Sequence, residues 1–258
     1  MKITAIKTRV LKPPKDDLFA VIRAAIKEIP ENSILAITSK VVGIHEGRCV
    51  PIKAIRGKKD LIIQESDKHL IEPLLFEGRE IRRTIKNNIL VSSAGIDESN
   101  ANEHYILWPI DPYRSARALH TFLKKEFGRK KIGVLITDST VVPLRRGTMG
   151  VALGYHGFVP LRDYRETPDL FGRLFKFSQT NLADGLAAAS VMIMGEGAES
   201  TPLAMITEIP FIRFIDRVYQ SNKKYSSLEV PEEEDLFGIF LSSAPWRAGG
   251  GGFRKDKK

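Results

Sequence analysis

Two aspartates are the strongest candidates for chemistry, because each follows an apolar run that predicts a strand. Asp97 comes after the run 88–93, and Asp138 comes after the run 132–137, which is the clearest buried strand in the chain. Carboxylate and hydroxyl oxygens suit Mg²⁺ or Mn²⁺, and such ions often bridge protein carboxylates to nucleotide phosphates. The residue types therefore predict a divalent-metal site; the alternative is that both carboxylates cap helices or turns.

Motifs for other chemistries are missing from the sequence. There is no G-x-x-x-x-G-K-[ST] phosphate loop, and Gly195-Glu196-Gly197 lacks the strand and helix context of a dinucleotide site. The five histidines stand at no metal-ligand spacing, and no nucleophile elbow is present. Cys49 is the only cysteine, so it can form neither an internal disulfide nor a thiolate metal site. Any metal must therefore be held mainly by oxygen.

Strands and helices alternate around these residues. Alternating or apolar runs predict an edge strand over 3–11, buried strands over 34–37 and 132–137, and further strands over 88–93 and 203–206. Three helices are expected: one capped by Asp16, one begun by Asp111-Pro112 and ended by Gly128, and one over 181–194 capped by Thr180. Residues 60–85 predict an interrupted helix, and residues 140–180 read as irregular.

The long irregular middle argues against a regular doubly wound sheet, so the pattern favours a mixed α+β architecture. We expect one folded domain over residues 1–247. Four consecutive glycines and a basic end predict a disordered tail over residues 248–258.

Composition bounds the function class. The formal net charge is +9. The last five residues contribute +3 of this charge, and the remaining charge is dispersed along the chain. Because the sequence has no recognition motif, we do not expect nucleic acid as a partner. A phosphorylated small molecule would also suit a basic pocket. No apolar run approaches the roughly 20 residues needed to cross a bilayer, and no signal peptide is evident. We expect a cytoplasmic protein without a membrane partner.

Five segments, taken in order, resemble consecutive motifs of the coenzyme F-420-0:L-glutamate ligases, which are gamma-glutamyl ligases. They are residues 93–100, 109–116, 136–147, 169–173 and 183–195. Residues 39–40 and 46–48 extend the match, which covers about residues 5–208. The resemblance implies an unusual mixed α/β fold of two intimately packed subdomains, a homodimer, and GTP as co-substrate. In this chemistry the acceptor carboxylate takes the γ-phosphoryl group of GTP, and the amine of L-glutamate attacks the acyl phosphate.

The resemblance also implies roles for individual residues. Asp97 and Asp138, with Ser139 beside the second aspartate, would bind Mg²⁺ or Mn²⁺. The arginines Arg145, Arg146 and Arg173 would hold phosphate or carboxylate groups of the substrates; alternatively, they form a solvated salt-bridge surface. The implied nucleotide contacts are Val10, Leu11, Lys12, Ser39, Lys40, Asn100, Gly195, Glu196, Gly197 and Ala198.

Several basic or flexible positions of the family are replaced in this chain. The replacements are Ile44, Val141-Val142, Glu166-Thr167 and Thr207-Glu208. Because both aspartates remain, we expect retained metal and nucleotide handling with a changed acceptor site. The acceptor is then an F-420 precursor, a folate or another pterin-like acid. A noncatalytic nucleotide-binding relative is the alternative from a different class.

Overall fold

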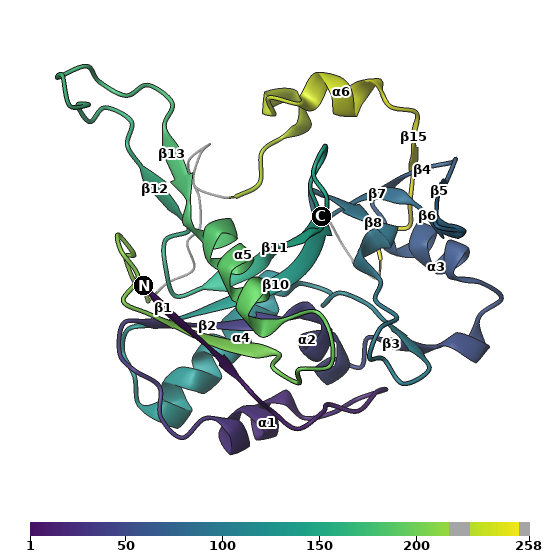
Figure 1. The fold of residues 1–258 in the computed structure, drawn as a ribbon, viewed down its shortest axis with the longest axis horizontal. Helices are drawn as coiled ribbons and strands as arrows, with labels where there is room; N and C mark the ends of the chain where they lie inside the picture. The colour runs from purple at the N-terminus through teal and green to yellow at the C-terminus, as the bar shows by residue number, and fades with distance from the viewer. Residues whose placement is uncertain (217–227, 253–258) are drawn as a thin grey trace.

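The computed structural model describes residues 1–216 and 228–252, and its centre is a five-stranded mixed sheet (Figure 1). The strand order is β1 (Lys2–Ile6), β14 (Leu203–Thr207), β2 (Ser33–Thr38), β10 (Ile132–Val141) and β11 (Thr148–His156). Only β2 and β10 pair in parallel; the other neighbours in this sheet are antiparallel. The predicted edge strand at the N-terminus is confirmed over Lys2–Ile6, and the mixed α/β architecture is confirmed.

Helices cover both faces of this sheet because its central strands are apolar on both sides. Leu35 and Ile37 of β2 pack in one core with α1 (Leu18–Ala25), α2 (Ser39–His45) and α4 (Pro112–Phe127). Ile34 and Ala36, which point to the opposite face, pack in a second core with α5 (Leu182–Met194). Continuous apolar runs in the sequence therefore correspond to strands buried between two layers of helices.

The helix caps agree with the sequence in one case and shift by one residue in two. Asp111 caps α4, accepting a hydrogen bond from the Arg114 amide at 3.0 Å, and Gly128 ends that helix at φ 65°. Asp17, rather than Asp16, caps α1. Asn181, rather than Thr180, caps α5. Asp16 was a wrong prediction because its carboxylate instead pairs with Arg9 at 2.6 Å.

A second, four-stranded sheet lies beside the first. Its order is β15 (Trp246–Ala248), β4 (Lys68–Leu70), β7 (Arg83–Lys86) and β8 (Ile89–Ser92), and α3 (Lys58–Glu65) precedes β4. The helix predicted over 60–85 was wrong beyond Glu65, since that stretch forms β4, β5 (Leu74–Phe76), β6 (Arg79–Ile81) and most of β7. Pairing of β4 with β15, far along the chain, outweighs local helix propensity.

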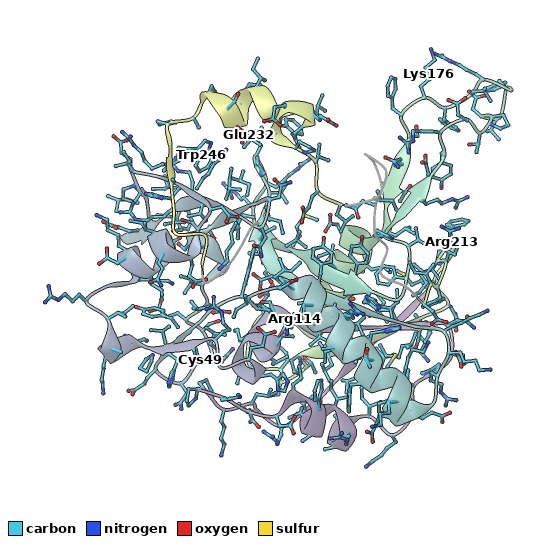
Figure 2. The ribbon with its side chains drawn as sticks, turned by 180° about the vertical axis from the view of Figure 1, so that it is seen from behind. Cys49, Arg114, Lys176, Arg213, Glu232 and Trp246 are labelled. Atoms are coloured by element: carbon cyan, nitrogen blue, oxygen red, sulfur yellow. The ribbon has the colours of Figure 1, made fainter. Side chains whose placement is uncertain are left out.

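The region 140–180, predicted to be irregular, contains two hairpins. The strand β10 continues to Val141 and pairs with β11, so Asp138 and Ser139 lie within the strand and not after its end. The second hairpin joins β12 (Leu161–Asp163) to β13 (Gln179–Asn181) and projects with its long loop from the body of the molecule (Figure 1). Figure 2 shows Lys176 on this projecting loop.

The remaining elements are short. The strands β3 (Cys49–Pro51) and β9 (His104–Ile106) pair with each other. Three 3₁₀ helices, η1 (Ile52–Ala54), η2 (Ser93–Gly95) and η3 (Glu232–Glu234), and the short helix α6 (Gly238–Ser243) lie between the strands in sequence. Of the tail expected to be disordered, Ala248 belongs to β15 and residues 249–252 hydrogen bond to the end of α3, whereas residues 253–258 lie outside the described residues.

A buried ion cluster lies where the two sheets meet. The Glu65 carboxylate at the end of α3 is fully buried and accepts from Arg48 at 2.6 Å and from Lys86 of β7 at 2.7 Å. Arg48 also donates through Nε to the backbone oxygen of Trp108 at 3.1 Å. Since a buried charge is costly without an opposite partner, this cluster constrains how α3, β7 and the segment before β3 pack together.

Candidate active site

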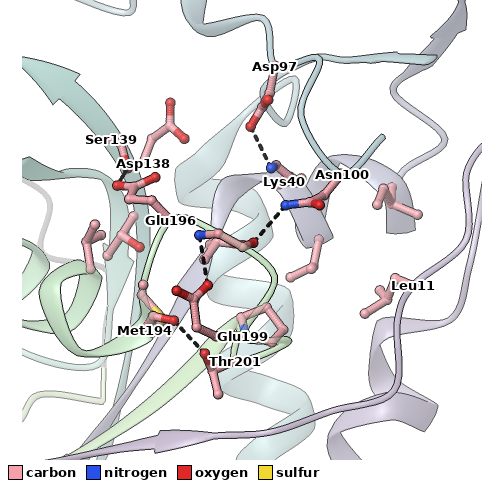
Figure 3. Close-up of a pocket in the computed structure, with 18 of the residues that line it drawn as sticks. Leu11, Lys40, Asp97, Asn100, Asp138, Ser139, Met194, Glu196, Glu199 and Thr201 are labelled. Atoms are coloured by element: carbon pink, nitrogen blue, oxygen red, sulfur yellow. Dashed lines mark hydrogen bonds and ion pairs between the residues drawn. The ribbon is translucent and has the colours of Figure 1, made fainter. Parts of the chain in front are cut away.

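A cavity of about 740 Å³ opens at the edge of the central sheet (Figure 3). Most of its lining comes from five segments: 8–11, 38–44, 91–102, 137–139 and 191–202. The first segment follows β1, the second covers most of α2, the third runs on from the end of β8, the fourth lies within β10 and the fifth runs on from the end of α5. The fold therefore gathers distant parts of the chain at one place. The cavity is large enough for a small-molecule ligand of nucleotide size.

Asp97 lies in this cavity beside a lysine. The Lys40 ammonium at the start of α2 is 2.7 Å from Oδ2 of Asp97. The other oxygen, Oδ1, accepts from the Ser99 amide at 2.7 Å and from the Ser99 hydroxyl at 2.8 Å. Burial by itself would raise the pKa of the Asp97 carboxyl, but the Lys40 charge and the hydrogen bonds from Lys40 and Ser99 outweigh it and lower that pKa.

Asp138 lies in the same cavity and, among the residues that the structure describes, forms no ion pair with a cation. Its Oδ1 accepts from the Ser39 hydroxyl at 2.8 Å, and its Oδ2 accepts from the Trp108 indole N–H at 2.6 Å. Burial, together with the negative charge of Asp97, raises the pKa of the Asp138 carboxyl to about 6 although its hydrogen bonds act to lower it. The two carboxylates are therefore close enough to influence each other, and the pKa values of the two groups are shifted in opposite directions.

The glycine-containing loop after α5 forms another wall of the cavity. The Asn100 side-chain amide donates to the Gly197 carbonyl oxygen at 2.8 Å, and the Gly197 amide donates to Glu199 at 2.8 Å (Figure 3). The Ser139 hydroxyl donates to the Glu196 carboxylate. These bonds fix the loop to β10 on one side and to the segment carrying Asp97 on the other.

The donor atoms fit a divalent cation in type. Asp97, Asp138 and the Ser139 hydroxyl offer only oxygen, which Mg²⁺ and Mn²⁺ prefer. Within residues 1–216 and 228–252, no three His, Cys, Asp or Glu side chains gather as a metal-holding group. Two carboxylates with remaining positions for water and phosphate oxygen match the way Mg²⁺ usually binds beside a nucleotide. The protein alone does not supply a complete coordination shell.

Most of the residues predicted for the site come together here. The cavity lining includes Asp97, Asp138, Ser139, Val10, Leu11, Lys40, Asn100, Gly195, Glu196, Gly197 and Ala198. Ser39 is 97% buried and reaches the cavity only through Asp138. Lys12 does not line the cavity; its side chain is exposed, and its backbone amide donates to Asp16 at 2.9 Å.

The three predicted arginines lie elsewhere. Arg145 and Arg146 are exposed in the turn between β10 and β11, and Arg173 is exposed in the loop between β12 and β13. None of them lines the cavity of its own chain. Among the positions that depart from the ligase motifs, Ile44 lines the cavity, whereas Val141-Val142 and Glu166-Thr167 lie on the two hairpins.

Three residues of the site have no counterpart in the predictions. Trp108 contacts Asp138, Glu199 holds the loop after α5, and Lys58 lines the cavity while pairing with Glu98 at 2.9 Å. Glu199 follows the predicted loop by one residue, so extending that loop would have found it. Trp108 directly precedes the motif 109–116 and does not line the cavity, which it reaches through Asp138. Lys58 carried no sequence signal, because only the packing of separate elements brings it to the cavity.

Paired carboxylates, a lysine and a glycine-containing loop thus surround one cavity of a mixed α/β fold, and this cavity is the candidate small-molecule site. The sequence model described as F420-0:gamma-glutamyl ligase matches residues 5–208. The chain belongs to this family. Within the described residues, no helix has the length and apolar character needed to cross a membrane.

Curated relatives agree with this assignment. The chain is 36% identical to the coenzyme F420:L-glutamate ligase of Methanopyrus kandleri over 202 residues, which cover 73% of this chain and 79% of the relative. It is 30% identical to the enzyme of that name from Methanocaldococcus jannaschii, covering 81% and 86% of the two chains. The corresponding protein of Methanothermobacter thermautotrophicus is 30% identical, with 86% and 92% covered.

Proposed function

We propose that this protein is a metal- and GTP-dependent gamma-glutamyl ligase that joins L-glutamate to a carboxylate of an acceptor resembling the coenzyme F420 precursor. Family membership and the names of the relatives support the ligase activity. The observation that carries the finer proposal is the meeting of Asp97, Asp138 and Lys40 with the loop 195–198 in one cavity.

The proposed reaction has two transfers. A carboxylate oxygen of the acceptor attacks the γ-phosphorus of GTP, the bond to the bridging oxygen breaks, and GDP leaves. The amine of L-glutamate then attacks the acyl carbon, and phosphate leaves with the acyl oxygen. The nitrogen loses a proton to solvent as the amide forms. Both transfers gather anionic reactants, so the site must neutralise charge and hold the reacting atoms close.

The residues of the cavity divide these tasks. Asp97, Asp138 and Ser139 would hold Mg²⁺ or Mn²⁺, which neutralises phosphate charge when bound. Lys40 would contribute a further positive charge, and its bond to Asp97 at 2.7 Å keeps the ammonium at that wall of the cavity. Asn100 and the loop 195–198 would contact the nucleotide, with Val10 and Leu11 on the apolar side.

The acceptor is the least constrained part of the proposal. Of the positions that depart from the ligase motifs, Val141-Val142 and Glu166-Thr167 lie on the β10–β11 and β12–β13 hairpins, Thr207-Glu208 lie at the end of β14, and Ile44 lines the cavity. A change confined to these places would alter acceptor recognition while leaving the carboxylates intact. A folate or another pterin-like acid is therefore the competing acceptor.

We also propose that the protein is a homodimer. Exposed apolar side chains gather on the two hairpins: Leu144, Leu170, Phe171 and Phe177. Exposed groups of this size commonly mark protein contacts. The same hairpins carry Arg145, Arg146 and Arg173. In a dimer, these arginines would reach the substrate bound in the cavity of the other copy.

The activity is tested by incubating the purified protein with GTP, Mn²⁺, L-glutamate and each candidate acceptor, with glutamyl products detected by mass spectrometry. We expect product with one acceptor class and a requirement for both GTP and the metal ion. Asp97→Asn and Asp138→Asn should each lower turnover by about 100-fold or more, because each removes one charge that holds the cation.

Asp60→Asn is the matched control, since Asp60 is exposed on α3 and lies outside this cavity. It should retain activity. GTP binding measured by calorimetry without turnover on any acceptor would support a noncatalytic relative instead. Absence of both nucleotide binding and product would refute the proposed function.

A further inference from the structure

Trp108 is a buried residue whose only polar side-chain atom points at the candidate site. Trp108 is 1% exposed and lies two residues after the end of β9. Its indole N–H donates to Oδ2 of Asp138 at 2.6 Å. A buried indole needs an acceptor, and a backbone carbonyl would satisfy it equally well in a purely structural role. Here the acceptor is a carboxylate that lines the cavity.

The indole is held from several sides. A Cβ atom on Gly95 would lie 2.1 Å from the Trp108 ring, so the ring rests against the glycine backbone. The Lys86 ammonium lies 5.7 Å from the ring centroid, and Arg48 donates to the Trp108 backbone oxygen at 3.1 Å. Both cations are fixed by the buried Glu65 carboxylate. The donor therefore has little freedom to move.

The hydrogen bonds to Asp138 fix the orientation of its carboxylate plane. Ser39, which is 97% buried, occupies one direction at Oδ1, and Trp108 occupies one direction at Oδ2. Each carboxylate oxygen accepts along two directions, and the Ser139 backbone amide is a third donor to this carboxylate, so one direction remains for a cation. Two rigid donors on separate oxygens leave the carboxylate few ways to rotate. Carboxylates that bind metals are commonly fixed by such partners.

We propose that Trp108 is a positioning residue that holds Asp138 in the orientation needed to bind the divalent cation. This inference rests on the proposed function, because it assumes that Asp138 is a metal ligand. Trp108 touches neither the cation nor a substrate in this role. Its contribution is made through the single N–H bond to Oδ2, and Ser39 makes the equivalent contribution at Oδ1.

The test removes the N–H donor and measures Mn²⁺ binding directly. Trp246→Phe provides the parent, because Trp246 bonds to Leu241 outside the cavity and the chain has only two tryptophans. Incorporation of 3-benzothienylalanine for tryptophan in this parent replaces the N–H of residue 108 by sulfur while keeping the ring size. Trp108→Phe is the second variant. Electron paramagnetic resonance of free Mn²⁺ gives the affinity without requiring turnover.

We expect both changes to weaken Mn²⁺ binding by about 10-fold, within the range found for partners of metal ligands. In steady-state assays the KM for Mn²⁺ should rise more than kcat falls at saturating metal. Ser39→Ala should weaken Mn²⁺ binding similarly. Thermal unfolding monitors the fold, and the benzothienyl protein should unfold within a few degrees of its parent because the packing is retained.

The outcomes separate the two proposals. If neither the wild type nor the Trp246→Phe parent binds Mn²⁺, the metal site is refuted and with it the proposed function. Mn²⁺ binding in the parent that is unchanged by both substitutions at residue 108 would refute the positioning role alone. Weakened binding only in Trp108→Phe, with the benzothienyl protein unaffected, would assign the effect to lost packing and also refute that role.

Discussion

Asp97 and Asp138 are chemically identical side chains in opposite electrostatic surroundings. Lys40 and Ser99 keep the Asp97 carboxyl ionised, with its pKa below the usual range. Asp138 has hydrogen bonds but no cation, and burial raises its pKa to about 6. The two carboxylates therefore differ. Lys40 already balances the negative charge of Asp97, whereas an incoming cation would stabilise the negative charge of Asp138 most.

Two neighbouring histidines, one on α4 and one on β11, have pKa values that are shifted by their surroundings. The rings of His120 and His156 lie 4.6 Å apart, and His120 is 96% buried. Burial, with smaller contributions from the neighbouring His156 and Lys124, lowers the pKa of His120 to about 4. Burial also lowers the pKa of His156. Both imidazoles are therefore held neutral in the folded state.

This pair predicts loss of stability on mild acidification. The unfolded pKa of histidine is about 6.5 and the folded value is lower, so the unfolded state binds more protons and stability falls as pH drops from about 6.5 toward 4. His120 should account for about 3 kcal/mol of that loss. Urea unfolding at several pH values measures it. His120→Leu should show a shallower pH dependence; an unchanged slope would contradict the prediction.

At the scale of elements, the four glycines 249–252 form a strap over the end of α3. The amides of Gly250 and Gly252 donate to the carbonyl oxygens of Ile63 and Gln64, each at 2.9 Å. These carbonyls belong to the last turn of α3, where no amide of the same helix can reach them. The strap therefore caps α3. It also lies beside the buried Glu65, because a Cβ atom built on Gly252 would be 3.2 Å from Oε2 of Glu65.

Gly250→Ala should destabilise the protein because a Cβ there would lie 2.5 Å from the Gln64 oxygen. We expect a loss of about 1–3 kcal/mol, as found when extra atoms are forced into packed positions. Gly185→Ala is the matched control, since Gly185 lies within α5 with open space around it. That change should stabilise by about 0.5–1 kcal/mol. Equal unfolding midpoints for the two variants would contradict the strap's role.

At the scale of the whole molecule, the two hairpins differ from the body by their exposed apolar residues. Leu170 and Phe171 are among the most exposed apolar side chains, and both lie on the loop between β12 and β13. That loop extends away from the body in both ribbon views (Figures 1 and 2). We call this hairpin, residues 161–181, the arm. Contact with another protein surface would bury the apolar side chains of Leu170 and Phe171 that the arm exposes.

The proposed dimer predicts that polar substitutions on the arm change the assembly state. The double variant Leu170→Ser and Phe171→Ser should shift the protein from dimer toward monomer in sedimentation velocity, because it removes apolar area from the contact. Met192→Ser is the control, since Met192 is 75% exposed and lies on α5, not on either hairpin. A monomeric wild type would refute the dimer.

Much of the fold follows from sequence because local patterns decide it. Apolar runs predicted β2, β8, β10 and β14, and the Asp-Pro start and glycine end predicted α4. The ordered motifs determined the family and selected Asp97, Asp138, Lys40 and the loop 195–198 as neighbours. Such features depend on residue type and spacing along the chain, which a single sequence contains in full.

Tertiary structure decided what depends on contacts between distant segments. Pairing with β15 and β8 made strands of a region whose local pattern favoured helix, and pairing with β11 drew Asp138 into a strand. The close contact of Gly95 and the buried cluster at Glu65 brought Trp108 onto Asp138. Two long hairpins carried the three arginines away from the cavity. The physical reason is that packing and long-range hydrogen bonding outweigh local preference wherever the two conflict.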